Sequence, residues 1–412
     1  MPISDALTRQ VDLVPFSRRL AAFVLRRPLW TCVWLGVALR VWVYLHARSY
    51  WMDEASLLGN LKGKAPFDFT GHLASDQLAP PGFLAAERAL IGLLGESPYV
   101  ARLIPMICGV AALFLFRRFA GRLLEPTAAV VAMVLFAFSD DLVYYSNELK
   151  PYSTDLALGL AVTLLSLSEL RDPPDRRRLW AIAALAVASP WLSFPSAFVV
   201  AGCGLTLLID RLRDGRKADA ARLAAIALAW GFSLMLAYRT SSRMLAPATS
   251  MYVFWNFAFP PFPPTSPADL AKTMGILLET FVTPLNLVPR VLPYAFALFA
   301  ATLGVSGALW LARKDPAALA ILLVPAALAL VAATTRRYPF HGRLILWLAP
   351  AFLALIAQGA ARVRWSRGAA WLALVLVLLM AYPVVDALYQ AAPPHVREFN
   401  PHGDLRRNRF MD

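Results

Sequence analysis

The 412-residue sequence is poor in charged residues and contains only three cysteines. Charged side chains make up 16% of the chain, whereas soluble domains contain about 25%. This scarcity, with an apolar fraction of 59%, argues against a soluble protein and predicts a polytopic membrane protein. Cys32, Cys108 and Cys203 all lie in apolar stretches without metal-ligand or disulfide spacing, so we interpret them as small core residues.

The sequence also lacks a phosphate-binding glycine loop, a dinucleotide-binding motif, internal repeats and a recognisable soluble domain. Its net charge is +14, which in a soluble protein would suggest nucleic-acid binding. Here most arginines fall in short segments between apolar runs, a pattern typical of the cytoplasmic loops of membrane proteins. We therefore expect the lipid bilayer as a partner, and no nucleic acid.

Eleven apolar runs are candidates for membrane-spanning helices, which need about 20 residues each. The hairpin at 178–210 is the weakest candidate, because prolines divide it and its first half is short. The expected class is an all-α polytopic membrane protein. The candidate runs are 28–46, 98–118, 125–143, 152–170, 178–191, 194–210, 221–239, 291–312, 316–334, 343–361 and 369–387.

The distribution of basic residues predicts the orientation of these runs. If the N-terminus lies in the cytoplasm, every short cytoplasmic loop is basic, as the positive-inside rule requires. The first run then acts as an uncleaved signal anchor, and the protein lies in the bacterial inner membrane. The expected regions are a basic cytoplasmic segment at 1–27, a transmembrane domain at 28–387, extracytoplasmic loops at 47–97 and 240–290, and an extracytoplasmic tail at 388–412.

Two helices are expected to lie in the outer membrane interface without crossing it. Residues 82–95 are apolar but would span only about 21 Å as a helix. The second begins at Ser266, followed by Pro267 and Asp269, which is a helix-start signature. An apolar face with Leu270 and Met274 follows it.

Unusual polar residues gather in the segments predicted to be extracytoplasmic. Asp53 and Glu54 form an acidic pair just after the first apolar run. Such a pair is either a solvated loop start or part of a functional site. Arg40 lies inside the run itself, where we expect it to contact a carboxylate or a lipid phosphate.

Three arginines, Arg336, Arg337 and Arg343, cluster in one short loop on the face where the orientation rule disfavours them. An anionic ligand such as a phosphate would explain them, and the alternative is local pairing with acidic residues. Arg102 and Lys150 stand at the mouths of two spans on the same face. Lys150 is either a phosphate ligand or an interfacial lysine that extends outward. The histidines show no ligand spacing, so the sequence indicates no metal or other cofactor, although a divalent metal is compatible with it.

The stretch from Arg40 to Trp51-Met52-Asp53-Glu54-Ala55 resembles the opening of glycosyltransferase family 39. That family and its relatives include protein O-mannosyltransferases and the aminoarabinose transferases of lipid A. Later stretches resemble it in the same order, and together they cover roughly residues 30–360. They are Gln77 to Pro81, Ser97 to Pro105, Tyr145 to Asp155, and Gly342-Arg343 with the following Leu348 to Pro350.

This resemblance implies a GT-C fold with an extracytoplasmic active site and a polyprenyl-phosphate sugar as donor. It implies that Asp53 is the catalytic base and that Glu54 supports it or contacts the acceptor. The aminoarabinose transferases carry a lysine where this chain has Gln77. The donor phosphate is therefore expected on other cations, namely Lys150, Arg343, Arg102 and Arg337. The expected substrate-binding residues are Tyr145, Glu148, Tyr152, His72, Gln77 and Tyr338.

The expected reaction is transfer of a sugar from a polyprenyl phosphate to an extracytoplasmic glycan, lipid or protein acceptor. The alternative is a transporter or flippase for lipid-linked saccharides. A transporter would place polar residues in mid-helix and show broken helices in paired halves, which the sequence does not display. A third interpretation is a non-catalytic subunit of an envelope-assembly complex.

Overall fold

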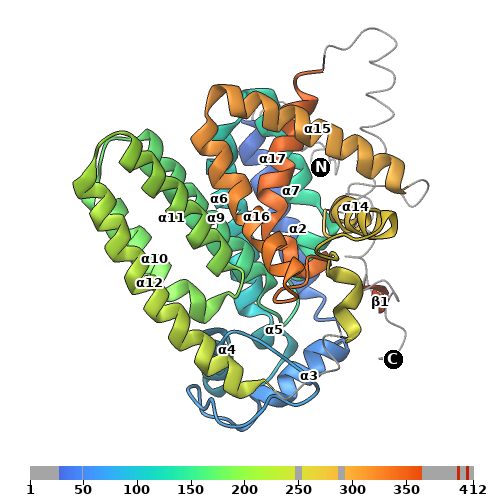
Figure 1. Ribbon diagram of the computed structural model, residues 1–412. Coiled ribbons are helices and arrows are strands. Elements are labelled where there is room, and N and C mark those ends of the chain that lie inside the picture. The colour runs from blue at the N-terminus through green and yellow to red at the C-terminus, as the bar shows by residue number, and fades with distance from the viewer. Residues whose placement is uncertain are drawn as a thin grey trace, which may run out of the picture.

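The computed structural model describes residues 27–48, 50–245, 253–285, 293–363, 397–399 and 405–407. Helices dominate the described residues, and most of them pack side by side in one bundle (Figure 1). The first half contains α2 (Pro28–Leu45), α3 (Met52–Leu61), α4 (Pro81–Leu94), α5 (Pro98–Ala101), α6 (Leu103–Leu123), α7 (Pro126–Phe138), α8 (Asp140–Tyr145), α9 (Tyr152–Arg171) and α10 (Arg176–Leu192).

The second half contains the remaining helices and one short pair of strands. The antiparallel strands β1 and β2 of the expected C-terminal tail are the exception to the all-α prediction. The elements are α11 (Ser196–Arg213), α12 (Lys217–Met244), the 3-10 helix η1 (Trp255–Ala258), α14 (Pro267–Val282), α15 (Pro293–Lys314), α16 (Pro316–Thr334), the 3-10 helix η2 (Gly342–Leu348), α17 (Ala349–Ala360), β1 (Arg397–Phe399) and β2 (Leu405–Arg407).

Seven described helical segments are long and apolar enough to cross a membrane, which identifies a multi-pass membrane protein. The expected hairpin at 178–210 forms α10 and α11, which do not belong to these seven. The expected run at 369–387 lies outside the described residues, so the number eleven stays a prediction. The seven segments are Pro28–Leu45, Leu103–Leu123, Tyr152–Arg171, Lys217–Met244, Tyr294–Lys314, Pro316–Thr334 and Gly342–Ala360.

The expected continuous span at 125–143 is wrong in one respect, because the helix breaks at Ser139. That residue has φ −56° and ψ 126°, so α7 ends at Phe138 and the short helix α8 follows. The break leaves the last carbonyl groups of α7 without helical partners. Arg40, fully buried in α2, donates from Nη1 to one of them, Ala137 O, at 3.0 Å and to Gly36 O at 3.2 Å. Its partners among the described residues are therefore backbone carbonyls and not the expected carboxylate, while the contact with a lipid phosphate stays a prediction.

The two interfacial helices expected from the sequence are present as helices α4 and α14. The helix α4 packs against α5, α10 and α12, while its last residues Leu93 and Leu94 are exposed. The helix α14 starts with the expected capping box of Ser266 and Asp269. Its Leu270 side chain is 60% exposed, which suits contact with lipid. Their position in the membrane interface stays a prediction.

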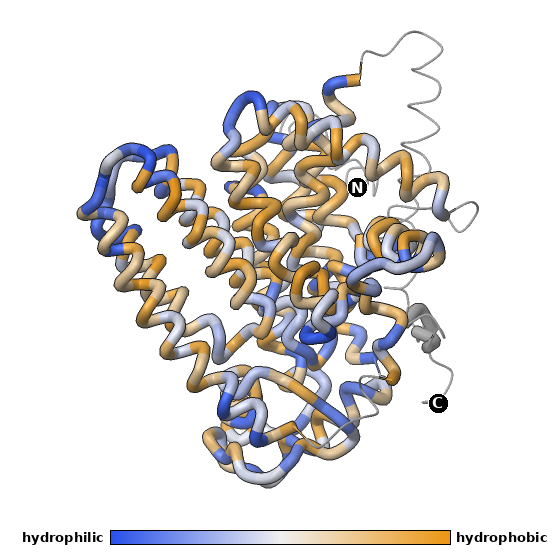
Figure 2. The backbone as a smooth tube through the Cα atoms, viewed as in Figure 1, coloured by the Kyte–Doolittle hydropathy of each residue, from blue (hydrophilic) through white to orange (hydrophobic). Residues whose placement is uncertain are grey.

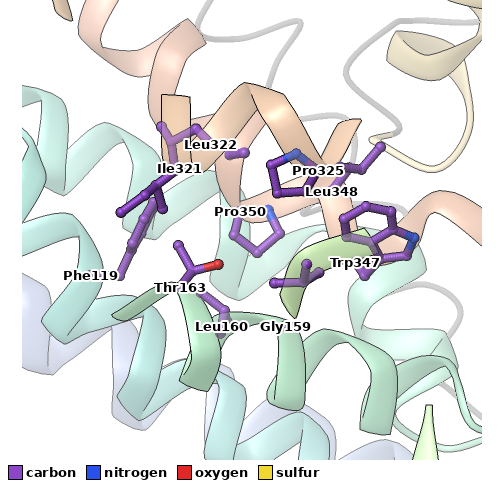
Figure 3. A pocket seen from close by; sticks show the side chains of 12 residues that line it. Phe119, Gly159, Leu160, Thr163, Ile321, Leu322, Pro325, Trp347, Leu348 and Pro350 are labelled. Atoms are coloured by element: carbon purple, nitrogen blue, oxygen red, sulfur yellow. The ribbon is translucent and has the colours of Figure 1, made fainter. Parts of the chain in front are cut away.

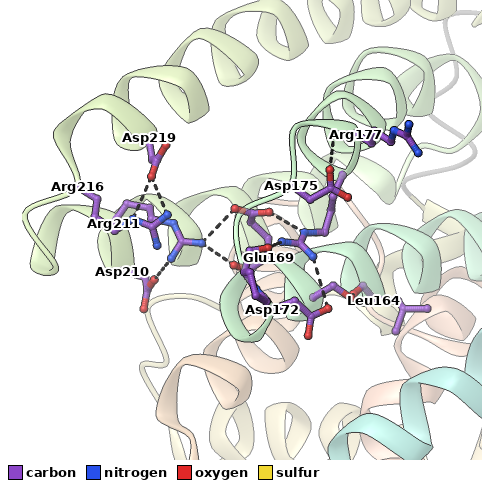
Figure 4. A network of polar contacts seen from close by, with 12 residues as sticks. Leu164, Glu169, Asp172, Asp175, Arg177, Asp210, Arg211, Arg216 and Asp219 are labelled. Carbon is purple, nitrogen blue, oxygen red and sulfur yellow. Dashed lines mark hydrogen bonds and ion pairs between the residues drawn. The ribbon is translucent and has the colours of Figure 1, made fainter.

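Polar contacts join the helix ends at the face predicted to be cytoplasmic. Glu169 of α9 accepts hydrogen bonds from Arg178 of α10 at 2.7 Å and from Arg211 of α11 at 3.2 Å (Figure 4). Arg171 adds an ion pair of 2.7 Å with Asp315 before α16. Figure 2 shows hydrophilic residues gathered at the helix-joining turns and hydrophobic residues along the helices between them. The described chain thus has two polar ends and an apolar middle, as a bilayer requires.

A small apolar cavity of about 20 Å³ lies in the middle of the bundle (Figure 3). It lies between α9, α16 and the η2–α17 segment, and Leu160, Ile321 and Trp347 contribute to its lining. A volume of this size accommodates about one water molecule. The cavity is therefore a packing defect of the core and too small for a sugar or a lipid chain.

The helices α15 and α17 cross at two glycines with their backbones in contact. A Cβ atom added at Gly307 would lie 2.0 Å from Leu355 O, and one at Gly359 would lie 1.9 Å from Leu303 O. Small residues allow this close approach in membranes, where helix association depends on packing and not on the hydrophobic effect.

The substitution Gly359→Ala should therefore destabilise the protein by about 1–3 kcal/mol, because the added methyl group forces the two helices apart. The matched control is Gly231→Ala in α12, where no atom lies within 4 Å of an added Cβ. Thermal unfolding in detergent, followed by tryptophan fluorescence, measures the difference. A midpoint for Gly359→Ala equal to that of the control would contradict the close crossing.

Candidate active site

Asp53 and Glu54 occupy the first turn of α3, a helix that the sequence analysis did not predict. The helix begins after Trp51, whose backbone is extended and whose N–H donates to Glu54 Oε2 at 3.2 Å. Carboxylates in a first turn also interact favourably with the positive end of the helix dipole. The acidic pair therefore helps to start α3 and places two carboxylates side by side in its first turn.

Glu54 is fully buried and is held by two arginines from different segments. Arg102 donates from Nε at 2.7 Å and from Nη2 at 2.8 Å, and Arg48 donates from Nη1 at 3.1 Å. The backbone N–H of Leu149 adds a bond of 2.9 Å. Burial raises the pKa of Glu54, but the charges of Arg48 and Arg102 outweigh this and lower it to about 2. Glu54 therefore stays ionised and connects three segments of the chain, those of Arg48, Arg102 and Leu149.

Asp53 lies beside Glu54 in a different environment. Its side chain is 18% exposed, and its Oδ2 atom forms an ion pair of 2.7 Å with Arg343 Nη2. Gln77 donates to Oδ1 at 3.4 Å and accepts a hydrogen bond from Lys150. Burial raises the pKa of Asp53, but the charges of Arg343 and Lys150 outweigh this and hold it below the ordinary value. The result is an ionised, partly accessible carboxylate between two cations.

Arg343 reaches Asp53 because the chain turns sharply just before it. Gly342 has φ +53°, a left-handed conformation that glycine adopts without strain. The guanidinium group of Arg343 then lies over the rings of Trp51 and Tyr152, at 5.6 and 5.7 Å from their centroids. Tyr145 packs edge-on against Tyr152 at 5.2 Å and extends this aromatic wall. The cation is therefore held by rings as well as by its ion pair.

Glu148 and Asn147 bring buried polar atoms to the same site. Trp51 Nε1 donates to Glu148 Oε1 at 3.2 Å, while Glu148 Oε2 and Asn147 Oδ1 have no hydrogen-bond partner among the described residues. Burial and the nearby charge of Glu54 raise the pKa of Glu148. Burial also lowers the pKa of the Lys150 ammonium group. Unpartnered buried polar atoms are rare in proteins, so they mark a place where a ligand could bind.

The structure does not bring every expected site residue into this cluster. His72 and Arg337 are exposed and form no hydrogen bond or ion pair with the described residues through their side chains. The Tyr338 hydroxyl donates to Leu344 O, and its ring packs on Phe198. Arg102 forms an ion pair with Glu54 through both Nε and Nη2. Its charge is therefore neutralised by a carboxylate and is not directed at the expected phosphate.

Three residues of the site were absent from the sequence-based selection. They are Arg48, Asn147 and Trp51. Arg48 Nη2 donates a hydrogen bond to Asn147 O at 3.0 Å. Trp51 contacts both Glu148 and Arg343. Arg48 could have been found, because it follows the first span on the face where the orientation rule disfavours arginine. Among the described residues, no group of three or more His, Cys, Asp or Glu side chains could hold a metal ion.

The fold and the site define a class: a multi-pass helical membrane protein with a carboxylate and cation cluster at one end. The sequence matches no protein-family model and no curated protein. The structure is similar to the archaeal oligosaccharyltransferase AglB from Archaeoglobus fulgidus, solved with an inhibitory peptide and a dolichol-phosphate. The identity is 13% and the TM-score 0.52, over 90% of this chain and 56% of AglB.

A second similar structure is the Archaeoglobus fulgidus oligosaccharyltransferase in complex with Zn and sulfate. Its identity is 15% and its TM-score 0.47, over 88% of this chain and 52% of that one. The chain thus spans about half the length of the structures it matches. The similarity to AglB confirms the expected GT-C fold, and at this identity it shows the fold alone. The closer resemblance to family 39 stays a prediction.

The geometry of Glu54 makes it a structural anchor, so Glu54→Gln should destabilise the protein. The change leaves the charges of Arg102 and Arg48 without a carboxylate, which typically costs about 3–5 kcal/mol. Glu96→Gln is the control, because Glu96 and its partner Lys62 are exposed and such pairs contribute about 0–1 kcal/mol. Guanidinium unfolding in detergent measures both.

The same comparison has a defined pH dependence. The folded-state pKa of Glu54, about 2, lies below the ordinary value of 4.5, so its contribution is complete above pH 4.5. It is lost as the pH falls toward 2. The stability difference between the wild type and Glu54→Gln should therefore shrink over this range, and a constant difference would contradict the buried ion pair.

Proposed function

We propose that the protein is a membrane glycosyltransferase that transfers a sugar from a polyprenyl phosphate to an acceptor hydroxyl, with Asp53 as general base. The observation that carries the proposal is the pairing of the ionised, partly exposed Asp53 with Arg343, beside Lys150. The GT-C fold shared with AglB adds support, because that protein was solved with a dolichol-phosphate. The acceptor is an extracytoplasmic glycan, lipid or protein, and the membrane is the bacterial inner membrane.

The reaction requires cations to stabilise the leaving phosphate and a base to accept a proton, and this cluster can provide both. The bond between the sugar C1 and the donor phosphate oxygen breaks, and polyprenyl phosphate leaves with its negative charge. Arg343 and Lys150 offset that charge where it develops. A bond forms between C1 and the acceptor oxygen, whose proton passes to Asp53. No nucleotide sugar takes part, because the site lies on the extracytoplasmic face in the predicted topology.

The ion pair between Asp53 and Arg343 also links donor binding to the strength of the base. In the described structure the arginine holds the pKa of Asp53 below its ordinary value. A donor phosphate competes with Asp53 for the same guanidinium group. Once the arginine turns to the phosphate, the pKa of Asp53 rises toward the working pH, where a general base is most effective. Asp53 therefore becomes a better base only when the donor is present.

The neighbouring residues have distinct tasks in this proposal. Gln77 bonds to both Asp53 and Lys150 and so fixes their spacing. Glu54 and Arg102 position the segment and do not contact the reacting atoms. Tyr145, Tyr152 and Glu148 line the sugar side of the site, where Glu148 Oε2 is available to a sugar hydroxyl.

The exposed apolar side chains near this end of the bundle offer a surface for the polyprenyl chain. Leu270 and Met274 of α14 are 60% and 55% exposed. Such side chains in the outer part of a bilayer contact lipid tails, and the donor is itself a lipid. The donor therefore reaches the site from the membrane, while the acceptor reaches it from the aqueous side.

The first test replaces Asp53 with asparagine, which keeps the shape and removes the base. Loss of general-base catalysis typically lowers a rate by about 10²–10⁴-fold. Membranes of cells that lack the gene supply the donor and acceptor, and mass spectrometry follows the sugar that the purified protein adds to envelope glycans or lipids. Glu96→Gln serves as the surface control. Transfer by Asp53→Asn at the wild-type rate would mean that Asp53 is not the base.

The second test concerns the phosphate-binding cations Arg343 and Lys150. Removal of one charge-assisted hydrogen bond, in Arg343→Ala or Lys150→Ala, should weaken the binding of a polyprenyl phosphate by about 1.5–3 kcal/mol. Binding of decaprenyl phosphate to the protein in nanodiscs measures this directly. The exposed Arg118, at the other end of the bundle, provides the charge-matched control Arg118→Ala. Unchanged binding in both site variants would mean that Arg343 and Lys150 do not bind the phosphate, and Arg337 would be tested next.

A further inference from the structure

A separate cleft of about 460 Å³ opens beside the helix α14. The segment from Phe259 to Thr265 forms one wall, the first half of α14 forms another, and the end of α16 closes it. Its volume lies within the range of small-molecule sites, about 300–1,000 Å³. None of the residues that line it belongs to the Asp53 cluster.

Two cations from opposite sides of this cleft converge on Asn256. Lys272 of α14 donates from Nζ to Asn256 O at 3.2 Å, and Arg336 donates from Nη2 to Asn256 Oδ1 at 3.4 Å. Neither forms an ion pair with any described residue. The acidic residue of the lining, Asp269, is occupied by the helix cap, because its Oδ2 accepts from Thr265 and Ser266. Two unpaired like charges held together in a cleft favour an anion.

The backbone at Arg336 is strained in a way that supports a functional role. Arg336 has φ +58°, a left-handed conformation that non-glycine residues adopt rarely. It follows the last residues of α16, and the next N–H, that of Arg337, bonds back to Ala332 O at 2.8 Å. Glycine or asparagine is the usual residue at this position of a helix end. An arginine in this conformation costs conformational free energy. The left-handed backbone places its side chain so that it reaches Asn256.

The remaining lining has the chemistry of a saccharide site. Phe262, which is 72% exposed, presents a ring against which the C–H face of a sugar packs, whereas Phe259 of the same lining is buried. Thr265, Thr334 and Thr335 line the same cleft, and their hydroxyl groups already donate within the protein. Their oxygen atoms can still accept hydrogen bonds from sugar hydroxyls. The lining is more polar than that of a typical small-molecule site, which suits a ligand rich in hydroxyl groups.

The cleft is joined to the Asp53 cluster through one segment of the chain. Phe340 N donates to Ala258 O at 3.1 Å, and the His341 ring packs on Phe257 at 4.9 Å. The same segment carries Arg336 at the cleft and Arg343 at Asp53. Seven residues span at most about 25 Å, so a ligand of a few sugar units can occupy both places.

From these observations we propose that the cleft binds an anionic sugar unit of the acceptor, one that carries a carboxylate or a phosphate group. The proposal rests on the proposed function in one respect, because it is that function which makes the ligand an acceptor. The cations Lys272 and Arg336 bind the acidic group, and the sugar ring packs on Phe262.

The test measures binding without transfer, so that its outcome is independent of the catalytic assignment. Ligand-observed NMR titrations use the full chain in nanodiscs with glucuronic acid, glucose 6-phosphate, glucose and inorganic phosphate as probes. We expect at least one of the two acidic sugars to bind about tenfold more tightly than glucose or inorganic phosphate. The double variant Lys272→Gln, Arg336→Gln should lose this preference, since each removed charge weakens an anion contact about tenfold. Phe262→Ala should weaken the sugars but not inorganic phosphate.

Two matched variants separate this site from the rest of the protein. The double variant Arg118→Gln, Arg313→Gln removes the same charge from exposed residues elsewhere and should bind as the wild type does. Asp53→Asn should also keep the binding, even where it abolishes transfer. The proposal is overturned if no acidic sugar binds, if glucose binds equally well, or if the cleft variants bind like the wild type. Displacement of the sugar by farnesyl phosphate but not by inorganic phosphate would also overturn it, because the cleft would then belong to the donor.

Discussion

The buried ion pair between Glu54 and Arg102 is the contact on which the rest of the candidate active site depends. Burying a carboxylate without partners costs several kcal/mol, so Glu54 is acceptable inside the protein only with its full set of donors. These donors come from Arg48, Arg102 and the backbone at Trp51 and Leu149. Arg102 and Leu149 lie 48 and 95 residues from Glu54 in the sequence, so this one side chain fixes the position of both segments relative to α3.

The position of Asp53 follows from that of its neighbour. Successive side chains of a helix point about 100° apart, so a buried Glu54 at the start of α3 turns Asp53 toward a different side. That side is partly exposed and faces Arg343 and Gln77. Two adjacent carboxylates thus acquire different environments, one as a permanent anion in a closed network and one with access to a ligand. This division of two acidic groups by their surroundings is a common basis for acid–base catalysis.

The sequence predicted those parts of the fold that depend on local composition. The spans that became α2, α12 and α16 were expected within a few residues, because an apolar run long enough to cross a bilayer has few other stable conformations. The break at Ser139 was not predicted, since nothing in the apolar run 125–143 marks it apart from the polar residues after it. The short helix α3 was not predicted, because its stability comes from packing and from the hydrogen bonds of Glu54, which a local sequence pattern does not reveal.

The site was predictable only up to the choice of residues. The rule that arginine is disfavoured on the outer face selected Arg336, Arg337 and Arg343 together. The rule could not assign different roles to the three arginines. Those roles depend on the left-handed backbone at Arg336 and Gly342, and on contacts between residues 80 to 290 positions apart in the sequence. Both original explanations of the cluster also survive in part. Arg343 pairs with Asp53, as local pairing implies, and its role toward a phosphate is the proposal.

The distribution of polar groups along the described helices favours group transfer at one face over transport across the membrane. A transporter needs polar side chains and open volume near mid-membrane. Between the Asp53 cluster and the Glu169 network, the described residues line an apolar cavity of about 20 Å³, too small for a transported saccharide. The buried Arg40 donates to one carbonyl at the broken end of α7 and to one carbonyl of its own helix. In the proposed function, a ligand of Asp53 therefore comes from the outer side or from the lipid, and its reaction is completed where it binds.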